Sequence, residues 1–166
     1  MTLVDTILSR RSIRSYKKKE IPTDVLNKIL EDGRQAPSAA NRQPYHFIVV
    51  TDEEIKKKLS KGFFNRFIKE SPVTIVGCAN TDTFFTGKCS IIDTTIALQN
   101  MVIMAWLMGV GSCWIGDFKE DRVKPLLKIP KKWRVVALIT FGYPAEQPQS
   151  KRKKSMKELV SFNGFA

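Results

Sequence analysis

The segment between residues 90 and 108 constrains the fold of this chain more than any other feature. Its spacing predicts one long helix, polar in its first half and almost wholly apolar from Met101 onward. A helix with apolar residues on every side belongs in a protein core or a subunit interface. Its longest apolar run, Met101 to Val110, has 10 residues. Because a membrane-spanning helix needs about 20 residues, no membrane span is expected.

The remaining segments predict an α+β or an α/β protein. Thr2 and Asp5 predict a capped helix at the N-terminus, and Pro22 opens a second helix. A third helix starts at Asp52, with its three lysines 56–58 mostly solvated. Strands are expected over residues 46–51, 72–79, 112–115 and 133–142, and short helices over 120–128 and 155–160. Because helices separate these strands, we expect a small mixed sheet packed between helices.

Length and charge suggest a small basic protein. The 166 residues are expected to form a single domain, residues 1–166, and their net charge is +12. Residues 119–166 hold 12 basic and 4 acidic side chains, a net of +8. Such a surface attracts nucleic acid, an anionic membrane or a phosphorylated small molecule. The basic run 151–154 lacks interleaved aromatic side chains for stacking bases, so a nucleic-acid-binding module is only the alternative interpretation.

The cysteine and histidine content excludes several classes of site. With His46 as the only histidine, a multi-histidine metal site within one chain is excluded. Cys78, Cys89 and Cys113 form no Cys-x-x-Cys motif, which excludes a zinc knuckle and a thioredoxin-type site. This sparse, odd count and the lack of a signal peptide predict a cytoplasmic protein. We interpret His46 and Cys113 as structural. No nucleophile is paired with a base, so a cofactor is expected to perform any chemistry.

Three motifs are suited to a ligand. In the motif Arg10-Arg11-Ser12-x-Arg14, guanidinium groups and a hydroxyl suit a phosphate, although a solvated helix end would have the same composition. The loop of residues 36–45 has small residues that allow close approach to a flat ligand, or it is an ordinary connection with two prolines. In the segment 109–116, Gly-x-Gly follows a helix and precedes a strand. This order is the reverse of the dinucleotide-binding fingerprint, so a Rossmann site is rejected.

Taken in order, these motifs resemble the FMN-dependent nitroreductase family. The resemblance runs from Arg-Arg-Ser-Ile-Arg-Ser-Tyr through Ala-Pro-Ser-Ala-Ala-Asn-Arg-Gln-Pro-Tyr-His-Phe and Gly-Val-Gly-Ser-Cys-Trp-Ile-Gly to Phe-Gly-Tyr-Pro and the basic tail. It implies a nitroreductase-like α+β fold, an intertwined homodimer and one FMN in each of two interface sites.

The resemblance also implies which residues hold FMN. The groups expected at the phosphate and the ribityl chain come from both ends of the chain. They are Arg10, Arg11, Ser12, Lys151 and Lys153, with Arg152 as the alternative to Lys153. The groups expected around the flavin ring are Arg14 at the pyrimidine edge, the loop residues Pro37, Ser38, Ala39 and Asn41 of the partner subunit, Asn65 at the ring edge, and the backbone of Ile115 and Gly116 near N5. A fixed cation at the pyrimidine edge would stabilise the negative charge that reduction builds there.

The implied activity is electron transfer from NAD(P)H through FMN to an electron-poor acceptor, such as a nitroaromatic or a quinone, by a ping-pong mechanism. Dehalogenation, flavin fragmentation and ring dehydrogenation are alternatives within the same family, and the choice between NADH and NADPH stays open. The segment from Asn80 to Ile91 is shorter than in relatives with helical insertions. The pocket over the flavin is therefore expected to be open, or to be completed by the tail of residues 162–165.

Overall fold

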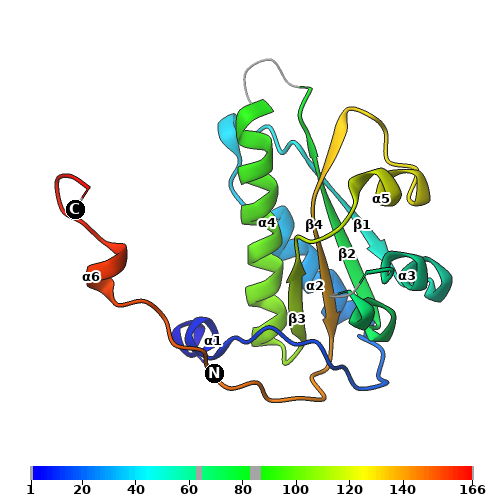
Figure 1. The fold of residues 1–166 in the computed structure, drawn as a ribbon, viewed down its shortest axis with the longest axis horizontal. Coiled ribbons are helices and arrows are strands. Elements are labelled where there is room, and N and C mark those ends of the chain that lie inside the picture. The colour runs from blue at the N-terminus through cyan, green and yellow to red at the C-terminus, as the bar shows by residue number, and fades with distance from the viewer. Residues whose placement is uncertain (1, 63–64, 83–86, 166) are drawn as a thin grey trace.

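The computed structural model describes residues 2–62, 65–82 and 87–165, which contain a four-stranded sheet. Its order is β1-β2-β4-β3, from strands β1 (Tyr45–Val50), β2 (Val73–Asn80), β3 (Gly111–Ile115) and β4 (Trp133–Gly142), as Figure 1 shows. All three strand pairs are antiparallel. The one parallel bridge within the described residues joins Ser12 to Ser112. The α+β class is thus confirmed, and the mixed character of the sheet is confined to this bridge.

The helices begin and end close to the predicted positions. They are α1 (Leu3–Ser9), α2 (Thr23–Arg34), α3 (Glu53–Leu59), α4 (Gly87–Leu107), α5 (Glu120–Leu126) and α6 (Met156–Leu159). Thr2 caps α1 as expected, since its hydroxyl accepts a hydrogen bond from the Asp5 amide at 3.1 Å. After α4, Gly109 has a φ of 75°, a left-handed conformation that favours glycine and ends the helix. Two short 3-10 turns, Ala39–Asn41 and Arg66–Glu70, were not predicted.

Helices cover both faces of the sheet. On one face, α2 and α4 pack against a buried cluster that includes Ile75, Leu98 and Ile139. On the other face, α3, α5 and the turn Arg66–Glu70 enclose a second cluster that includes Val76 and Leu138. Side chains alternate between the two faces of a strand, so the central strands β2 and β4 are mostly apolar on both faces. This explains the uninterrupted apolar runs that predicted these strands.

The long helix α4 is only partly a core helix. Its side chains Leu98, Met101 and Val102 are fully buried, which confirms that one face belongs to the core. Cys89–Leu107 is also long and apolar enough to cross a membrane, by length and composition alone. Within this chain, 44% of its most apolar stretch is buried. Ile92 and Leu107 are 59% and 41% exposed. The helix therefore has a second apolar face that its own chain does not cover.

Lys56 corrects the expectation that all three lysines of α3 are solvated. Its side chain is buried, and its Nζ donates hydrogen bonds to the carbonyl oxygens of Ser71 at 2.7 Å and Pro72 at 3.4 Å. Burial lowers the pKa of this ammonium group. Lys57 and Lys58 are exposed, as expected. The Lys56 ammonium group holds the backbone just before β2, because it binds the two carbonyl oxygens that precede this strand.

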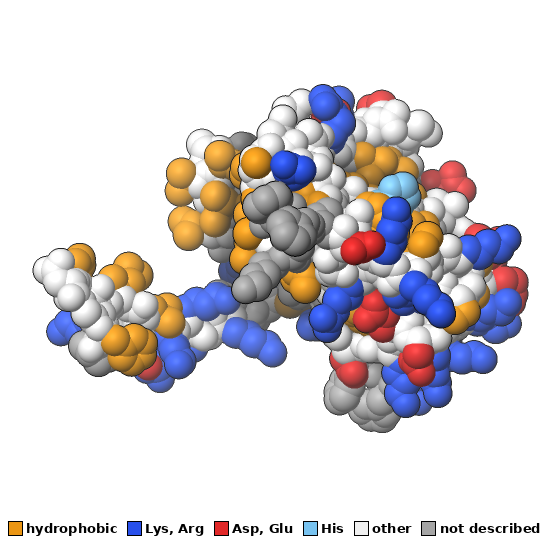
Figure 2. All heavy atoms as spheres, turned by 90° about the horizontal axis from the view of Figure 1, so that it is seen from above, with side chains coloured by type: hydrophobic (Ala, Val, Ile, Leu, Met, Phe, Trp, Pro, Cys, Tyr) orange, Lys and Arg blue, Asp and Glu red, His pale blue; other side chains and the backbone are white. Residues whose placement is uncertain are grey.

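Residues 151–165, here called the C-terminal arm, run away from the sheet (Figure 1). Every residue of the arm is exposed, including Met156 at 72%, Leu159 at 62% and Phe162 at 89%. In Figure 2 the arm stands apart from the body and displays both hydrophobic and basic side chains. Helix α1 also exposes apolar side chains, namely Leu3, Val4, Ile7 and Leu8. Exposed apolar side chains that gather in this way are typical of an interaction surface.

Candidate functional site

The basic motif near the N-terminus lies along the edge strand β3. The Ile13 amide donates a hydrogen bond to the Ser112 carbonyl oxygen at 2.9 Å, next to the bridge between Ser12 and Ser112. On the other side, Glu146 Oε1 accepts hydrogen bonds from the backbone amides of Arg14 at 2.5 Å and Ser15 at 3.0 Å. The segment is thus fixed by its backbone from two sides, while the Arg14 side chain stays exposed.

The three residues of the N-terminal motif that are predicted to bind the phosphate and ribityl chain are not equivalent. The Arg11 guanidinium donates hydrogen bonds to the carbonyl oxygens of Leu8 at 3.0 Å and Arg10 at 2.9 Å, so it occupies carbonyl groups at the end of α1. The side chains of Arg10 and Ser12 have no hydrogen bond to the described part of the chain. Arg10 and Ser12 therefore have donors left for a ligand, and Arg11 has fewer.

At the far end of β3, the structure brings Asn65 together with the Ile115–Gly116 backbone. Asn65 is 5% exposed, and its Nδ2 donates a hydrogen bond to the carbonyl oxygen of Asp117 at 2.5 Å. Gly116 is exposed, and a Cβ atom added there would meet no atom within 4 Å. The backbone at Gly116 thus faces open space with a buried amide group nearby. A pocket of about 660 Å³ opens beside Asn65 and Asp117.

The loop Pro37–Asn41 is held at the start of α4. Asp93 is buried, and both of its carboxylate oxygens lie 3.3 Å from the Ala39 amide, which donates to them. Ser38 Oγ accepts a hydrogen bond from the Gln43 amide at 2.9 Å. Ala40 and Asn41 have φ values of 52° and 53°, an unusual backbone shape that these contacts maintain. These contacts hold the loop in one shape, with Ala40 and Asn41 exposed and Ser38 and Ala39 half-buried.

One chain does not bring this loop to the basic N-terminal motif. The motif lies beyond the other end of α4, where Trp106 Nε1 donates a hydrogen bond to Ser9 Oγ at 2.9 Å. Asp93 and Trp106 are 13 residues apart. At about 1.5 Å per residue, this separation is about 20 Å along the helix.

The C-terminal candidates follow Glu146, which binds the backbone of the N-terminal motif. Lys151, Arg152 and Lys153 lie on the exposed arm, and so does the tail of residues 162–165. The expectation that the tail completes the pocket is therefore not met within one chain. Of the short segment between Asn80 and Ile91, residues 83–86 lie outside the described residues.

The residues interpreted as structural have ordinary packing roles. His46 is exposed on β1, and its ring makes an edge contact with Trp133 at 5.9 Å. Cys78, Cys89 and Cys113 are free thiols, and burial raises the pKa values of Cys78 and Cys113. Within the described ranges, no group of three or more His, Cys, Asp and Glu side chains is arranged to hold a metal ion.

The buried thiol of Cys78 is expected to make the protein less stable at alkaline pH. Burial raises the pKa of its thiol from 9.0 to about 11. Between these values the unfolded chain releases the proton and the folded chain keeps it, so the free energy of unfolding falls as pH rises. From pH 8 to pH 10.5 we expect this thiol alone to cost about 2 kcal/mol. Urea unfolding across this range should show a smaller decline for Cys78→Ala, and parallel declines in both proteins would contradict the prediction.

Comparison with known proteins gives consistent matches over most of the chain. The family model described as "Nitroreductase family" matches residues 7–83 and 85–143. A protein of Archaeoglobus fulgidus named NADH dehydrogenase/NAD(P)H nitroreductase is 37% identical over 147 residues, which cover 85% of this chain and 84% of that protein. A protein of the same name from Methanothermobacter thermautotrophicus is 35% identical over 153 residues, 89% of this chain and 80% of that protein. A solved structure described as an FMN-dependent nitroreductase from Clostridium difficile has a TM-score of 0.87 at 32% identity, covering 98% of this chain and 99% of its own.

Proposed function

The chain belongs to the nitroreductase family and is an NAD(P)H-dependent oxidoreductase with FMN as its cofactor, and we propose that it reduces electron-poor acceptors such as nitroaromatics and quinones. When bound, FMN would supply the redox chemistry, namely hydride transfer from the nicotinamide and electron transfer to the acceptor. A ping-pong order, in which the oxidised nucleotide leaves before the acceptor enters, suits a single open pocket.

The free thiols suit a reducing compartment, so we place the protein in the cytoplasm.

The residues along β3 fit FMN, and this fit is the observation that supports the proposal most. Arg10 and Ser12 offer unused donors for a phosphate beside the first part of the strand. The open backbone at Gly116 and the buried Asn65 amide lie at the other end, suited to a flat polar ring. The five residues of β3 separate these two groups by about 13 Å. A phosphate joined to a flavin ring by a ribityl chain has this extended shape.

We propose that the remaining groups of the site position the flavin ring or polarise it. Arg14 would place a fixed positive charge at the pyrimidine edge of the ring, where reduction builds negative charge. Glu146 holds the backbone of Arg14, so it is a positioning residue. The Ile115 and Gly116 backbone would lie near N5. No side chain acts as a general acid or base in this scheme.

A second copy of the chain would complete the site, and we propose a homodimer with FMN at the interface. In one chain the loop contacts α4 at Asp93 and the N-terminal motif is held near Trp106, about 20 Å further along that helix, and we propose that the loop at each flavin comes from the partner. We propose that Pro37, Ser38, Ala39 and Asn41 play this part. The arm would deliver Lys151 and Lys153, or Arg152 in place of Lys153, to the phosphate. The exposed apolar faces of α1, α4 and the arm would be covered in the same assembly.

The first experiment is an absorbance spectrum of the purified protein, repeated without oxygen after adding NADPH or NADH. We expect a bound-flavin spectrum that bleaches with the nucleotide and returns when a quinone or a nitroaromatic is added. Bleaching without reoxidation by either acceptor would reject the proposed acceptors and favour another flavin chemistry of the family. Protein that takes up no FMN after incubation would contradict the cofactor assignment itself.

A further inference from the structure

The pocket beside Asn65 has a cationic rim and an apolar floor. It lies between the end of α3 and the start of α5, with a volume of about 660 Å³. Leu59, Phe118 and Leu126 supply apolar lining. The rim contains four exposed cations, Lys58, Lys61, Lys119 and Arg122. Asp117 is the single acidic residue among the described residues that line the pocket. This combination suits a molecule with an apolar ring and several negative charges.

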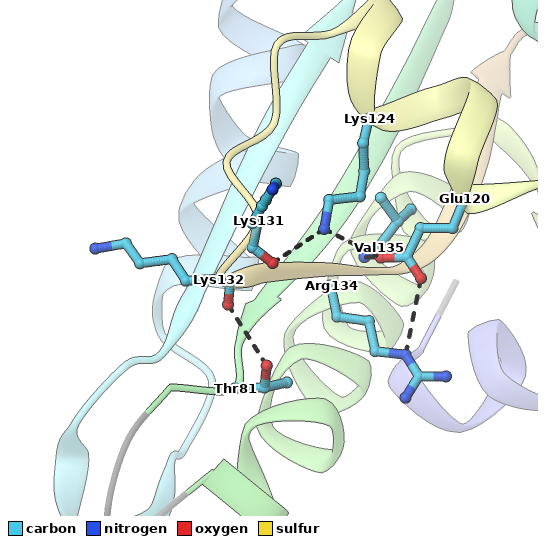
Figure 3. A network of polar contacts seen from close by, with 7 residues as sticks. All are labelled: Thr81, Glu120, Lys124, Lys131, Lys132, Arg134 and Val135. Carbon is cyan, nitrogen blue, oxygen red and sulfur yellow. Dashed lines mark hydrogen bonds and ion pairs between the residues drawn. The ribbon is translucent and has the colours of Figure 1, made fainter.

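Among the residues that the structure describes, no carboxylate lies within ion-pair distance of these four cations. The ion pairs of the described residues involve Arg34, Lys57, Lys124 and Arg134, and none includes a rim cation. Glu120, which directly follows Lys119, is held elsewhere: its Oε1 accepts a hydrogen bond from the Val135 amide at 3.0 Å. Figure 3 shows this carboxylate also facing Lys124 and Arg134. The neighbouring acid thus anchors α5 to β4 and leaves the rim positively charged.

The pocket adjoins the ring end of the proposed FMN site. It shares Asn65 with that site, and Asp117 directly follows Gly116. A dinucleotide whose nicotinamide ring lay at Gly116 would therefore have the pocket next to it for its adenosine half. Phe118 and Leu126 offer apolar surface for an adenine ring.

We propose that this pocket binds the adenosine 2′-phosphate of NADPH and makes NADPH the preferred electron donor; this inference rests on the proposed function. Both nucleotides have a pyrophosphate with two negative charges. The 2′-phosphate of NADPH is a monoester, and such a group adds about −1.5 to −2 at pH 7. Four unpaired cations match the charge of NADPH better than that of NADH. Arg122 can also bind a terminal phosphate through two parallel hydrogen bonds.

The test measures binding of adenosine 2′,5′-bisphosphate and of 5′-AMP to the FMN-loaded protein by titration calorimetry at fixed ionic strength. We expect the bisphosphate to bind at least about ten-fold more tightly, and Lys119→Gln/Arg122→Gln to abolish most of this difference. The double variant Lys28→Gln/Lys132→Gln is the control. It removes two exposed cations that do not line the pocket, and it should keep the discrimination. Equal binding of the two probes, or equal loss in the control, would overturn the proposal.

Steady-state kinetics give the second readout. In Lys119→Gln/Arg122→Gln we expect the KM for NADPH to rise about ten-fold or more and the KM for NADH to change less than about three-fold. An equal rise for both nucleotides would assign the pocket to the shared pyrophosphate and refute the 2′-phosphate assignment. The calorimetry separates this inference from the proposed function, because it needs no electron transfer. Protein that binds FMN but discriminates neither probe refutes only the inference, whereas protein without flavin refutes the proposed function.

Discussion

Removal of the C-terminal arm by ending the chain at Gln149 is expected to produce a monomer and to weaken FMN binding by at least about 100-fold. The arm makes no buried contact in its own chain, since every residue of it is exposed. Lys151 and Lys153 would each form a charge-assisted hydrogen bond with the phosphate, which contributes about 1.5–3 kcal/mol apiece. The truncated protein would also lack the apolar side chains that we expect the arm to place against the partner. Light scattering measures the mass of the protein, and titration with FMN measures the affinity.

Full-length variants separate the two roles of the arm. Lys151→Gln/Lys153→Gln should stay dimeric and lose about 100-fold or more in FMN affinity, because two charge-assisted hydrogen bonds are lost while the apolar contacts remain. Lys157→Gln on α6 removes an arm charge that we assign to no ligand, so it should bind FMN normally. Arg152→Gln tests the alternative assignment. A truncated protein that stays dimeric with unchanged FMN affinity would contradict the proposed role of the arm.

Leu98→Ala is expected to lower the free energy of unfolding by about 3–5 kcal/mol. Leu98 is fully buried where α4 crosses the sheet, and removal of such a side chain leaves a cavity as well as losing apolar contact. Gly77 makes this crossing close, because a Cβ atom there would lie 2.5 Å from Leu98 Cδ1. Gly77→Ala should therefore cost about 1–3 kcal/mol through overpacking. Urea unfolding at one protein concentration measures both changes.

The double variant Gly77→Ala/Leu98→Ala tests whether these two effects have one origin. Since the added methyl group would occupy part of the vacated space, the double variant should be more stable than the sum of the single changes predicts. Gly62→Ala is the control, because its nearest side-chain atom would be 3.5 Å away, an ordinary contact. Strictly additive costs would mean that Leu98 is not what makes Gly77 necessary.

The sequence predicted the elements with long apolar patterns and missed what depends on contacts between distant residues. The strands β2 and β4 were evident because both of their faces are largely buried, which makes most of their positions apolar. The turn Arg66–Glu70 has no pattern of its own. Lys56 looked like its neighbours in the sequence, and only the carbonyl groups of Ser71 and Pro72 distinguish it. Neither contact could be predicted without the position of α3 relative to β2.

For the candidate site, the order of the motifs identified the family, but it could not show which motifs meet. Asn65 had only a loose match in spacing, and the structure places it beside Asp117. The assignments to FMN stay predictions, because they depend on a second chain and a bound cofactor. The cationic pocket was not predicted at all. Its lysines and its arginine come from two segments far apart in the chain, and each segment alone resembles an ordinary solvated surface.

The order of the strands has a consequence for how the protein is made. The two central strands, β2 and β4, are separated in sequence by α4, β3 and α5. While the ribosome is still producing β4, β2 has only β1 beside it, and both hydrophobic clusters lack their members from β4. Partial structures of this kind expose apolar surface and unpaired strand edges. We therefore expect the nascent chain to stay unfolded until β4 has emerged, and then to fold at the slow rate typical of long-range strand pairing.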